Sequence, residues 1–370
     1  MKVIASKENL SNALQLAEDI ITAKTTMSIL SNRLLETVDN HLRIISTDLE
    51  VAIKILVNAD ITEPGAITLY AKKLTDIVKA LPNDDIEISI NENHIATIKS
   101  KNKEVKAEFK IKGLPRNDYP VLPEIKKEST IKVPQKDLKS MIRKTIFAVS
   151  TEDIRSAING VKLELKDKKL RFVATDGRRL ALMEQEIDSE LEINDVIIPH
   201  KVLNELLKIL SDEGEMELSL SENQIYFKVG EIEILSRLIE GKFPEYTQVI
   251  PKQYEKKVVF FTNKMFNAIK RVSLLTAEKK TGRIKFSFNP NLLELSSSDP
   301  EIGEAKEEIE ILYDYGEFEI AFSNEYLLDA VTAIDTEKFI MGFNSSESAA
   351  MVKEEGSDNF FCLIMPIRLS

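Results

Sequence analysis

The sequence predicts an α+β fold made of three copies of one domain, each with two helices and antiparallel strands. A strand runs into a Ser/Thr-Asp corner three times, at 42–48, 170–176 and 293–299. Successive corners are 128 and 123 residues apart. That spacing is the length of a domain, well above the roughly 20–50 residues of a solenoid repeat. Helix and strand signals are mixed within every copy, which is typical of the α+β class.

Each copy contains two predicted helices, one before the corner and one after it. Ser6 is suited to cap the first helix, and Pro134 and Pro199 fall in first helical turns. Leu10, Leu138 and Phe266 take matching positions in the helices that precede the corners. The predicted helices span 6–21, 71–80, 134–149, 199–210, 262–275 and 322–334.

The segments between the helices predict half-buried antiparallel strands, because apolar and polar residues alternate in them. Two segments, 85–100 and 216–231, are near-copies of one hairpin. Joints rich in proline and charge lie at 113–130 and 240–257. We therefore predict three domains, at 1–125, 126–251 and 252–370. The strand signals lie at 51–59, 85–90, 94–100, 106–111, 216–220, 224–229 and 231–238.

Length and composition limit the class of protein. A chain of 370 residues with 43% hydrophobic and 30% charged residues has material for two or three soluble domains. We expect no membrane span and no signal peptide, and a single cysteine, Cys362, fits the reducing cytoplasm. The three histidines are scattered and no metal-ligand spacing is present, so we expect neither a metal nor a cofactor.

The distribution of charge indicates a nucleic-acid partner despite the net charge of −11. Six helical windows carry +6 in total and the remainder of the chain carries −17. A protein that gathers its helices on one surface would present a basic face to a phosphate backbone. The alternative is that these lysines are ordinary solvated positions on amphipathic helices.

The repeated aspartates of the corners, Asp48, Asp176 and Asp299, are the starting point for an enzymatic interpretation. A Ser/Thr-Asp pair in a tight corner more often binds local backbone N–H groups. Three separate domains cannot bring the three carboxylates together. The corner ATDGRR (174–179) matches neither phosphate-binding glycine motif. We therefore predict that the protein is not an enzyme and has no catalytic residues.

The C-terminal segment is unusually apolar for a chain end. It reads NFFCLIMPIRLS (359–370), a strand followed by a proline-bounded tail. Chain ends are usually polar and frayed. We expect the tail to pack beside a pocket, and the alternative is a terminal strand that only closes its own sheet.

Five motifs together resemble those of one known family. They are TDLE (47–50), IRSAING (154–160), VATDGRRLA (173–181), EGKFPEYTQVIP (240–251) and MPIRL (365–369). In order and spacing they are similar to the beta subunit of bacterial DNA polymerase III, the sliding clamp, over the whole chain. The resemblance implies a head-to-tail homodimer, a ring of six domains with helices lining the hole. It also implies a processivity factor that tethers DNA polymerase III subunits, other polymerases and repair proteins to duplex DNA, and that meets a clamp loader.

The resemblance implies a pocket for short apolar partner peptides between the second and third domains. An apolar floor would take aliphatic and aromatic anchors, with arginines at the edge for polar or acidic groups. The residues carried over are Ile158, Thr175, Gly177, Arg178, Arg179, Leu180, Pro244, Val249, Tyr326, Met365, Pro366, Ile367, Arg368 and Leu369.

The resemblance also implies a DNA-facing inner surface and a subunit interface. The interface would join Phe109 and Ile111 of one subunit to Leu274 and Leu275 of the other. DNA-facing candidates are Lys24, Lys72, Lys73, Lys79, Lys136, Lys139, Arg143, Lys201, Lys264 and Lys270.

The chain departs from the family pattern at several places. Ser156-Ala157 stands where some members carry tyrosines, and Gln248 and Lys280 replace an arginine and an aromatic residue. The first change argues against base stacking from that loop, and the other two predict a somewhat different peptide preference. Two other classes stay open from the residues alone: a monomeric nucleic-acid-binding module, and an enzyme with a site at a domain interface.

Overall fold

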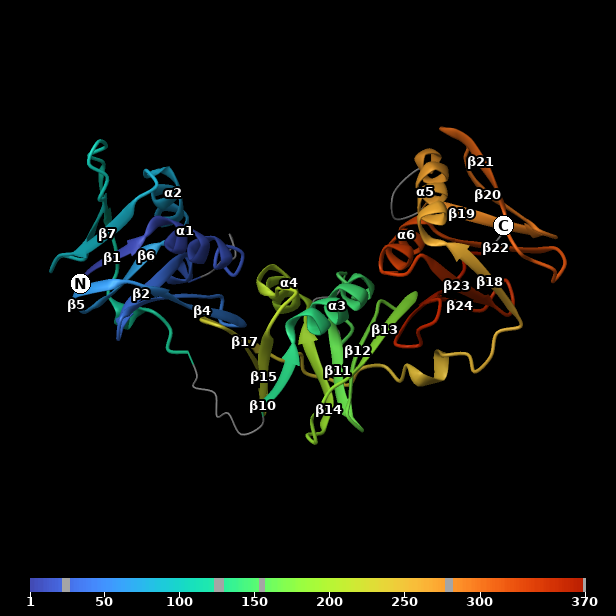
Figure 1. Cartoon of the computed structure of the whole chain (residues 1–370), viewed down its shortest axis with the longest axis horizontal. Coiled ribbons are helices and arrows are strands. Elements are labelled where there is room, and N and C mark those ends of the chain that lie inside the picture. The colour runs from blue at the N-terminus through green and yellow to red at the C-terminus, as the bar shows by residue number, and fades with distance from the viewer. Residues whose placement is uncertain (22–26, 123–129, 153–156, 277–281, 369–370) are drawn as a thin grey trace. The chain divides into compact units, whose positions relative to one another are not determined.

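The structure, a computed structural model, describes residues 1–21, 27–122, 130–152, 157–276 and 282–368. Its contacts divide the chain into two compact units, which are described separately (Figure 1). The first is Met1–Lys139 with Lys201–Leu238, and the second is Ser140–His200 with Ile239–Ser370. Helices combine with sheets whose paired strands are antiparallel throughout, so the predicted α+β class is confirmed.

The first unit contains an eight-stranded and a five-stranded sheet. Helices α1 (Lys7–Leu16) and α2 (Ala71–Ala80) lie side by side in it. The five-stranded sheet has the order β5 (Asp60–Glu63), β1 (Lys2–Ser6), β7 (Asp85–Ile90), β8 (Ile95–Ser100) and β9 (Glu108–Lys112). The eight-stranded sheet has the order β10 (Thr130–Pro134), β15 (Glu215–Ser221), β16 (Gln224–Val229), β17 (Ile232–Arg237), β4 (Val51–Asn58), β3 (His41–Thr47), β2 (Asn32–Val38) and β6 (Ala66–Tyr70).

The second unit contains an eight-stranded and a four-stranded sheet, with α5 (Thr262–Val272) and α6 (Asn324–Thr332) side by side. Two further helices, α3 (Gln135–Thr145) and α4 (His200–Ile209), contribute residues to both units. The eight-stranded sheet has the order β14 (Ile193–Pro199), β11 (Gly160–Lys166), β12 (Lys169–Thr175), β13 (Arg179–Glu186), β25 (Phe360–Ile364), β24 (Ala350–Glu354), β23 (Lys338–Phe343) and β18 (Lys256–Phe261). The four-stranded sheet has the order β21 (Gly303–Glu310), β20 (Leu292–Asp299), β19 (Arg283–Asn289) and β22 (Phe318–Ser323).

The helices bury one apolar face each against the sheets, as their spacing predicts. In α1, Leu10 and Leu14 are fully buried, and the matching buried pair in α5 is Met265 and Ile269. Phe266 is only half-buried, so its predicted equivalence to Leu10 is wrong by one residue. The error has a physical origin: Met265 and Phe266 are adjacent, large and apolar, and they differ only in the direction in which they point around the helix.

The three corners are built as the sequence predicts, with Asp48, Asp176 and Asp299 satisfying local backbone donors. In each corner one carboxylate oxygen accepts hydrogen bonds of 2.8–3.1 Å from the second and third residues after the aspartate. Each carboxylate is therefore occupied in holding a turn. The donating N–H groups belong to Glu50 and Val51, Arg178 and Arg179, and Glu301 and Ile302.

Two seams in the eight-stranded sheets join strands far apart in sequence. In the first unit β4 pairs with β17, and in the second unit β13 pairs with β25. Strands β4, β13 and β21 each follow a corner, whereas β9, β17 and β25 are each the third strand after a helix. Within the described residues, β9 and β21 are the members of these two sets that end a sheet with one side unpaired.

No helix within the described ranges combines the length and apolar character needed to cross a membrane.

Candidate partner-peptide site and DNA-facing surface

A pocket of about 230 Å³ opens where β13 and β25 meet in the second unit. Leu180 and Leu363 are paired across these two strands and both line the pocket. They belong to a buried cluster with Val173, Ile197 and Phe243, so the floor of the pocket is the surface of a packed core. The lining residues are Ile158, Thr175, Gly177, Arg178, Arg179, Leu180, Pro244, Glu245, Tyr246, Val249, Ala349, Leu363 and Met365.

Tyr246 forms an aromatic wall of the pocket. Its hydroxyl donates a hydrogen bond of 2.8 Å to Glu164, and the Lys162 ammonium lies 5.1 Å from the centre of its ring. Burial raises the pKa of Tyr246, and the hydrogen bond to Glu164 raises it further, so the hydroxyl stays protonated as a donor. These contacts fix the aromatic wall against which an apolar side chain could pack.

The corner at the pocket rim needs a glycine. Gly177 has φ = +83°, and a Cβ added there would meet nothing within 4 Å. The backbone conformation requires the glycine, because the surrounding space is open. The exposed Arg178 follows it, so the rim carries a cation next to this turn.

Arg179 is buried beneath this rim, where it connects the corner to α6. Its guanidinium donates to Asp176 (3.0 Å), to Asp329 (2.5 Å) and to the backbone carbonyl of Phe147 (2.5 Å). Its Cζ atom also lies 4.4 Å from the centre of the Tyr326 ring. Burial alone would lower the pKa of Arg179, but the hydrogen bond and charge of Asp329, together with Asp176, raise it. The side chain is a structural tie rather than a free contact for a peptide.

Replacing this tie should destabilise the second unit. We expect Arg179→Ala to lower the free energy of unfolding by about 2–3 kcal/mol, because two carboxylates and a carbonyl lose a buried partner. The midpoint of urea unfolding, followed by circular dichroism, measures the effect. Arg178→Ala is the matched control, since Arg178 is exposed and should change stability by less than about 0.5 kcal/mol. Equal midpoints for both variants would contradict the assignment.

The structure brings together most, but not all, of the residues predicted for the pocket. Nine of them line it, and four others do not: Tyr326, Pro366, Ile367 and Arg368. Tyr326 lies under Arg179, and Ile367 donates its N–H to the carbonyl of Ala321 at 2.7 Å. Leu369 lies outside the described residues.

The C-terminal segment both closes its sheet and lines the pocket, so the two interpretations of it are compatible. Strand β25 closes the sheet between β13 and β24. The next residue, Met365, donates its N–H to the carbonyl of Arg178 at 2.9 Å, is 45% exposed and forms part of the pocket lining. Sequence reasoning missed Glu245, Tyr246, Ala349 and Leu363. Of these, Glu245 and Tyr246 carried a signal, because they lie between the predicted Pro244 and Val249.

The candidate DNA-facing cations divide into two groups. Exposed lysines without an ion pair among the described residues are Lys72, Lys73, Lys136, Lys264 and Lys270. Four others are engaged: Lys79 with Glu18 (3.5 Å), Lys139 with Asp212 (2.8 Å), Arg143 with Asp335 (2.6 Å), and Lys201 with Asp48. Lys24 lies outside the described residues.

Among the DNA-facing candidates, Lys201 has the contacts that point most clearly to a structural role within the protein. Its ammonium binds the corner carboxylate of Asp48 and the carbonyl of Ile20. It therefore ties α4 to a corner of the first unit, much as Arg179 ties a corner to α6 in the second.

The residues predicted for the subunit interface lie on two separate elements. Phe109 and Ile111 are on β9, one of the two edge strands of the five-stranded sheet. Leu274 and Leu275 lie in a 3-10 turn at Ser273–Leu275. Leu274 is 74% exposed, which is unusual for a large apolar side chain. Leu275 lies beside Gly303, the first residue of β21.

Comparison with known proteins places this fold and these motifs in one family. Residues 1–123 match the N-terminal domain, 132–245 the central domain and 247–368 the C-terminal domain of the DNA polymerase III beta subunit. The beta sliding clamp of Staphylococcus epidermidis is 36% identical over 358 residues, covering 94% of each chain. That of Staphylococcus aureus is 34% identical over the same length and coverage.

Solved structures give the same result. The sliding clamp of Bacillus subtilis has a TM-score of 0.94 at 31% identity, over 100% of both chains. The DNA polymerase III subunit beta of Pseudomonas aeruginosa, in a crystal structure with bound griselimycin, has a TM-score of 0.93 at 35% identity over 100% of both chains. The fold is thus that of a sliding clamp with three domains of one kind.

The chain belongs to the family of bacterial DNA polymerase III beta subunits, the beta sliding clamps. Members of this family are processivity factors of DNA polymerase III and have no catalytic activity of their own.

Proposed function

We propose that two copies of this chain close head to tail into a ring around duplex DNA, and that the ring tethers DNA polymerase III to its template. Each copy would contribute three clamp domains, at 1–125, 126–251 and 252–370. The observation that carries the proposal is the pair of open sheet edges, β9 and β21. Their counterparts already join in pairs within the chain, β4 to β17 and β13 to β25. A second copy supplies the missing third seam.

Charge and side-chain orientation support one register for that seam. The less exposed face of β21 carries Gly303 and Ala305, and that of β9 carries Ile111. Placing Ala305 opposite Phe109 keeps these faces together. The same register sets opposite charges face to face on the other side: Glu304 with Lys110, Lys306 with Glu108, and Glu308 with Lys106.

Neighbouring registers are less favourable. A shift of two residues in one direction sets Lys306 opposite Lys110, and in the other direction sets Glu304 opposite Glu108. Like charges directly opposite each other on paired strands are destabilising. The edges therefore favour a single head-to-tail alignment of the two copies.

The helix ties support the same closure. Lys73 of α2 precedes the buried residues Leu74 and Thr75, as Lys201 of α4 precedes Val202 and Leu203. By this matching position, Lys73 would bind the third corner as Lys201 binds the first. In a closed ring the partner subunit's Lys73 would meet Asp299. One of the DNA-facing candidates would then belong to the interface.

The pocket below the TDGRR corner is the proposed site for polymerases, the clamp loader and repair proteins that carry short apolar peptides. Its apolar floor of Leu180 and Leu363, the aromatic wall of Tyr246 and the exposed Arg178 support this assignment. We also propose that the protein acts in the cytoplasm. Burial raises the pKa of its single cysteine, Cys362, to about 12, so the thiol stays protonated.

If the protein binds DNA by encircling it, its retention on DNA should depend on whether the DNA has free ends. Exposed lysines on separate helices would contact phosphates, which gives no base readout and weak, salt-sensitive binding. After loading by a clamp loader, the protein should stay on a nicked circular plasmid through gel filtration in 0.2 M salt. Cutting the plasmid once should release it within minutes, because a ring slides off free ends.

Two controls complete this experiment. Blocking both ends of the cut plasmid with bulky protein complexes should restore retention. Equal retention on circular DNA and on linear DNA with free ends would exclude encirclement and favour a monomeric DNA-binding module.

A further inference from the structure

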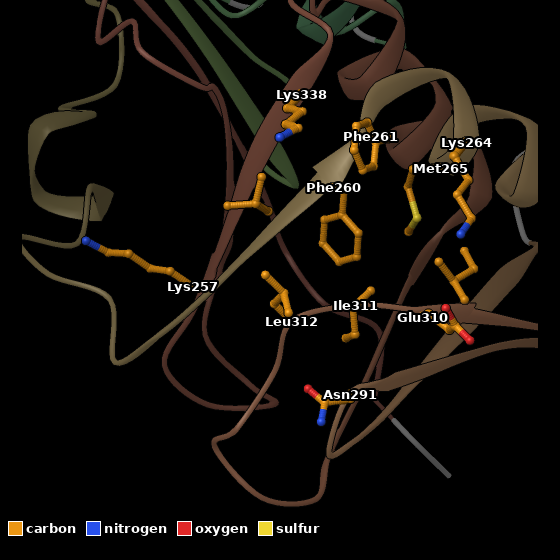
Figure 2. A pocket seen from close by; sticks show the side chains of 12 residues that line it. Lys257, Phe260, Phe261, Lys264, Met265, Asn291, Glu310, Ile311, Leu312 and Lys338 are labelled. Atoms are coloured by element: carbon orange, nitrogen blue, oxygen red, sulfur yellow. The ribbon is translucent and has the colours of Figure 1, made fainter.

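The second unit has a large cavity away from the peptide pocket, between β18 and the segment that follows β21. Its volume is about 780 Å³. Figure 2 shows Ile311 and Leu312 facing Phe260 across it, with Lys338 and Lys264 on the side of β18. The remaining lining residues are Lys257, Val259, Phe261, Met265, Asn291, Ile309 and Glu310.

One wall of the cavity is an open sheet edge. Strand β18 pairs with β23 on one side and ends the eight-stranded sheet on the other. The corresponding strand of the first domain is β1, since β1 runs into α1 as β18 runs into α5. Strand β1 is covered: β5 pairs with it antiparallel, with Val3 opposite Ile61. The same kind of edge therefore accepts a strand in one copy and lacks it in another.

The chain itself explains why the strand is missing. Seven residues, 59–65, connect β4 to β6 and supply β5; seven residues, 311–317, make the corresponding connection from β21 to β22. Both segments begin with the same kind of bond: Ala59 donates its N–H to the carbonyl of Asn40, and Ile311 donates its N–H to the carbonyl of Asn291. The later segment then makes a further bond, in which Asn291 donates its N–H to the carbonyl of Tyr313.

The packing of the Tyr313 ring holds the segment 311–317 in this course. The ring of Tyr313 is buried and stacks on Phe288 with centroids 5.1 Å apart. As a result Leu312 points outward and is 90% exposed, and Val259 and Phe261 on the strand edge are 44% and 52% exposed. An open backbone edge beside exposed apolar side chains is a site for strand addition.

The charges around the cavity define what could fill it. Three lysines, Lys257, Lys264 and Lys338, line it with one carboxylate, Glu310. The chain as a whole carries −11, so this is a local reversal of sign. The Lys338 ammonium lies 4.9 Å from the centre of the Phe261 ring, which places a cation directly over an apolar contact surface.

We propose that this cavity binds an extended acidic and apolar peptide segment of a partner protein, which adds to β18 as an antiparallel strand. The first domain supplies the pattern for such a segment. Its covering strand β5 reads Asp-Ile-Thr-Glu, with Ile61 between Asp60 and Glu63. Acidic side chains of the guest strand would face the three lysines, and its apolar side chains would cover Val259 and Leu312. This site is separate from the peptide pocket, and two of its lining residues, Ile309 and Glu310, lie at the end of β21, the strand proposed for the third seam.

A labelled peptide tests the proposal on the full chain. The probe is a fluorescein-labelled decapeptide with the β5 sequence Asp-Ile-Thr-Glu at its centre, titrated by fluorescence anisotropy at 50 mM salt. Saturable binding is expected, and the double variant Lys257→Glu, Lys338→Glu should weaken it by about tenfold. Neither lysine is a DNA-facing candidate. Lys166→Glu, at an exposed lysine on β11, is the matched control and should leave binding unchanged.

Four further outcomes test the proposal. Leu312→Asp should also abolish binding, because it places a carboxylate in the apolar wall while leaving the buried Tyr313 in place. A peptide with lysines in place of its acidic residues should not bind. Absence of saturable binding to the wild-type chain would overturn the proposal. Displacement of the peptide by duplex DNA, with the same dependence on Lys257 and Lys338, would also overturn it and assign the surface to phosphates.

Discussion

A protein carrying Leu274→Glu and Leu275→Glu is expected to be a folded monomer of about 41.9 kDa, whereas we expect the unchanged chain to form a dimer of twice that mass. The reason is the burial proposed at the third seam, where these leucines meet Phe109 and Ile111 of the partner subunit. Apolar burial contributes about 25 cal/mol per Å², so four such side chains supply several kcal/mol per interface. Two carboxylates would have to be buried in their place. Sedimentation velocity measures the mass directly.

Leu312→Glu is the matched control for this experiment. Leu312 is even more exposed than Leu274, at 90% against 74%, but it lies outside the proposed interface. The control should stay dimeric, which separates interface loss from a general effect of surface charge. A dimeric double variant would place the interface elsewhere.

Charge exchange tests the register of the seam independently. Lys110→Glu alone or Glu304→Lys alone should weaken the dimer, because each places like charges opposite each other. The two changes together should restore it. Restoration by Lys110→Glu with Glu308→Lys instead would show that the strands are shifted.

Deleting residues 365–370 should remove binding of short apolar peptides and leave the dimer intact. The deletion takes away Met365, whose side chain lines the pocket and whose N–H bonds to the carbonyl of Arg178. Strand β25 and both interface edges remain. We expect at least about a hundredfold loss of affinity, since an anchor pocket loses one wall. A fluorescent peptide with leucine and phenylalanine anchors, titrated against both proteins, measures it.

A shorter deletion gives the control. Removing only 368–370 keeps Met365 and the backbone bond between Ile367 and Ala321, so peptide affinity should change little. Unchanged affinity after the longer deletion would move the site away from the tail. Arg179→Ala should act on peptide affinity indirectly, through the stability of the corner, because its guanidinium is already occupied by Asp176 and Asp329.

The features that sequence predicted well are those in which spacing alone carries the information. The corners were found from a strand followed by Ser/Thr-Asp, and their carboxylates hold the turns as predicted. Helix positions followed from apolar periodicity. Spacing could not distinguish Met265 from Phe266, because neighbouring apolar residues differ only by their angle on the helix.

Other features depend on contacts between distant segments, which one sequence does not reveal. Arg179 and Asp329 are 150 residues apart and form an ion pair through the fold. The covering of β1 depends on its pairing with β5, about 60 residues later in the chain. Within the described residues β18 lacks a matching strand, and this depends on where Tyr313 packs. The pocket contribution of Ala349 is likewise set by β24 reaching β25. The predicted domain boundaries and site roles stay predictions.

The seams between β4 and β17 and between β13 and β25 bear on how this sequence can evolve. They are ladders of backbone hydrogen bonds, whose donors and acceptors are the same for almost every amino acid. Substitutions along a seam can therefore accumulate as long as the alternation of buried and exposed side chains is kept. Such drift is consistent with relatives that share about a third of their residues with this chain while keeping its fold. Selection would then act most strongly on the few side chains that ladders cannot replace, such as the corner aspartates.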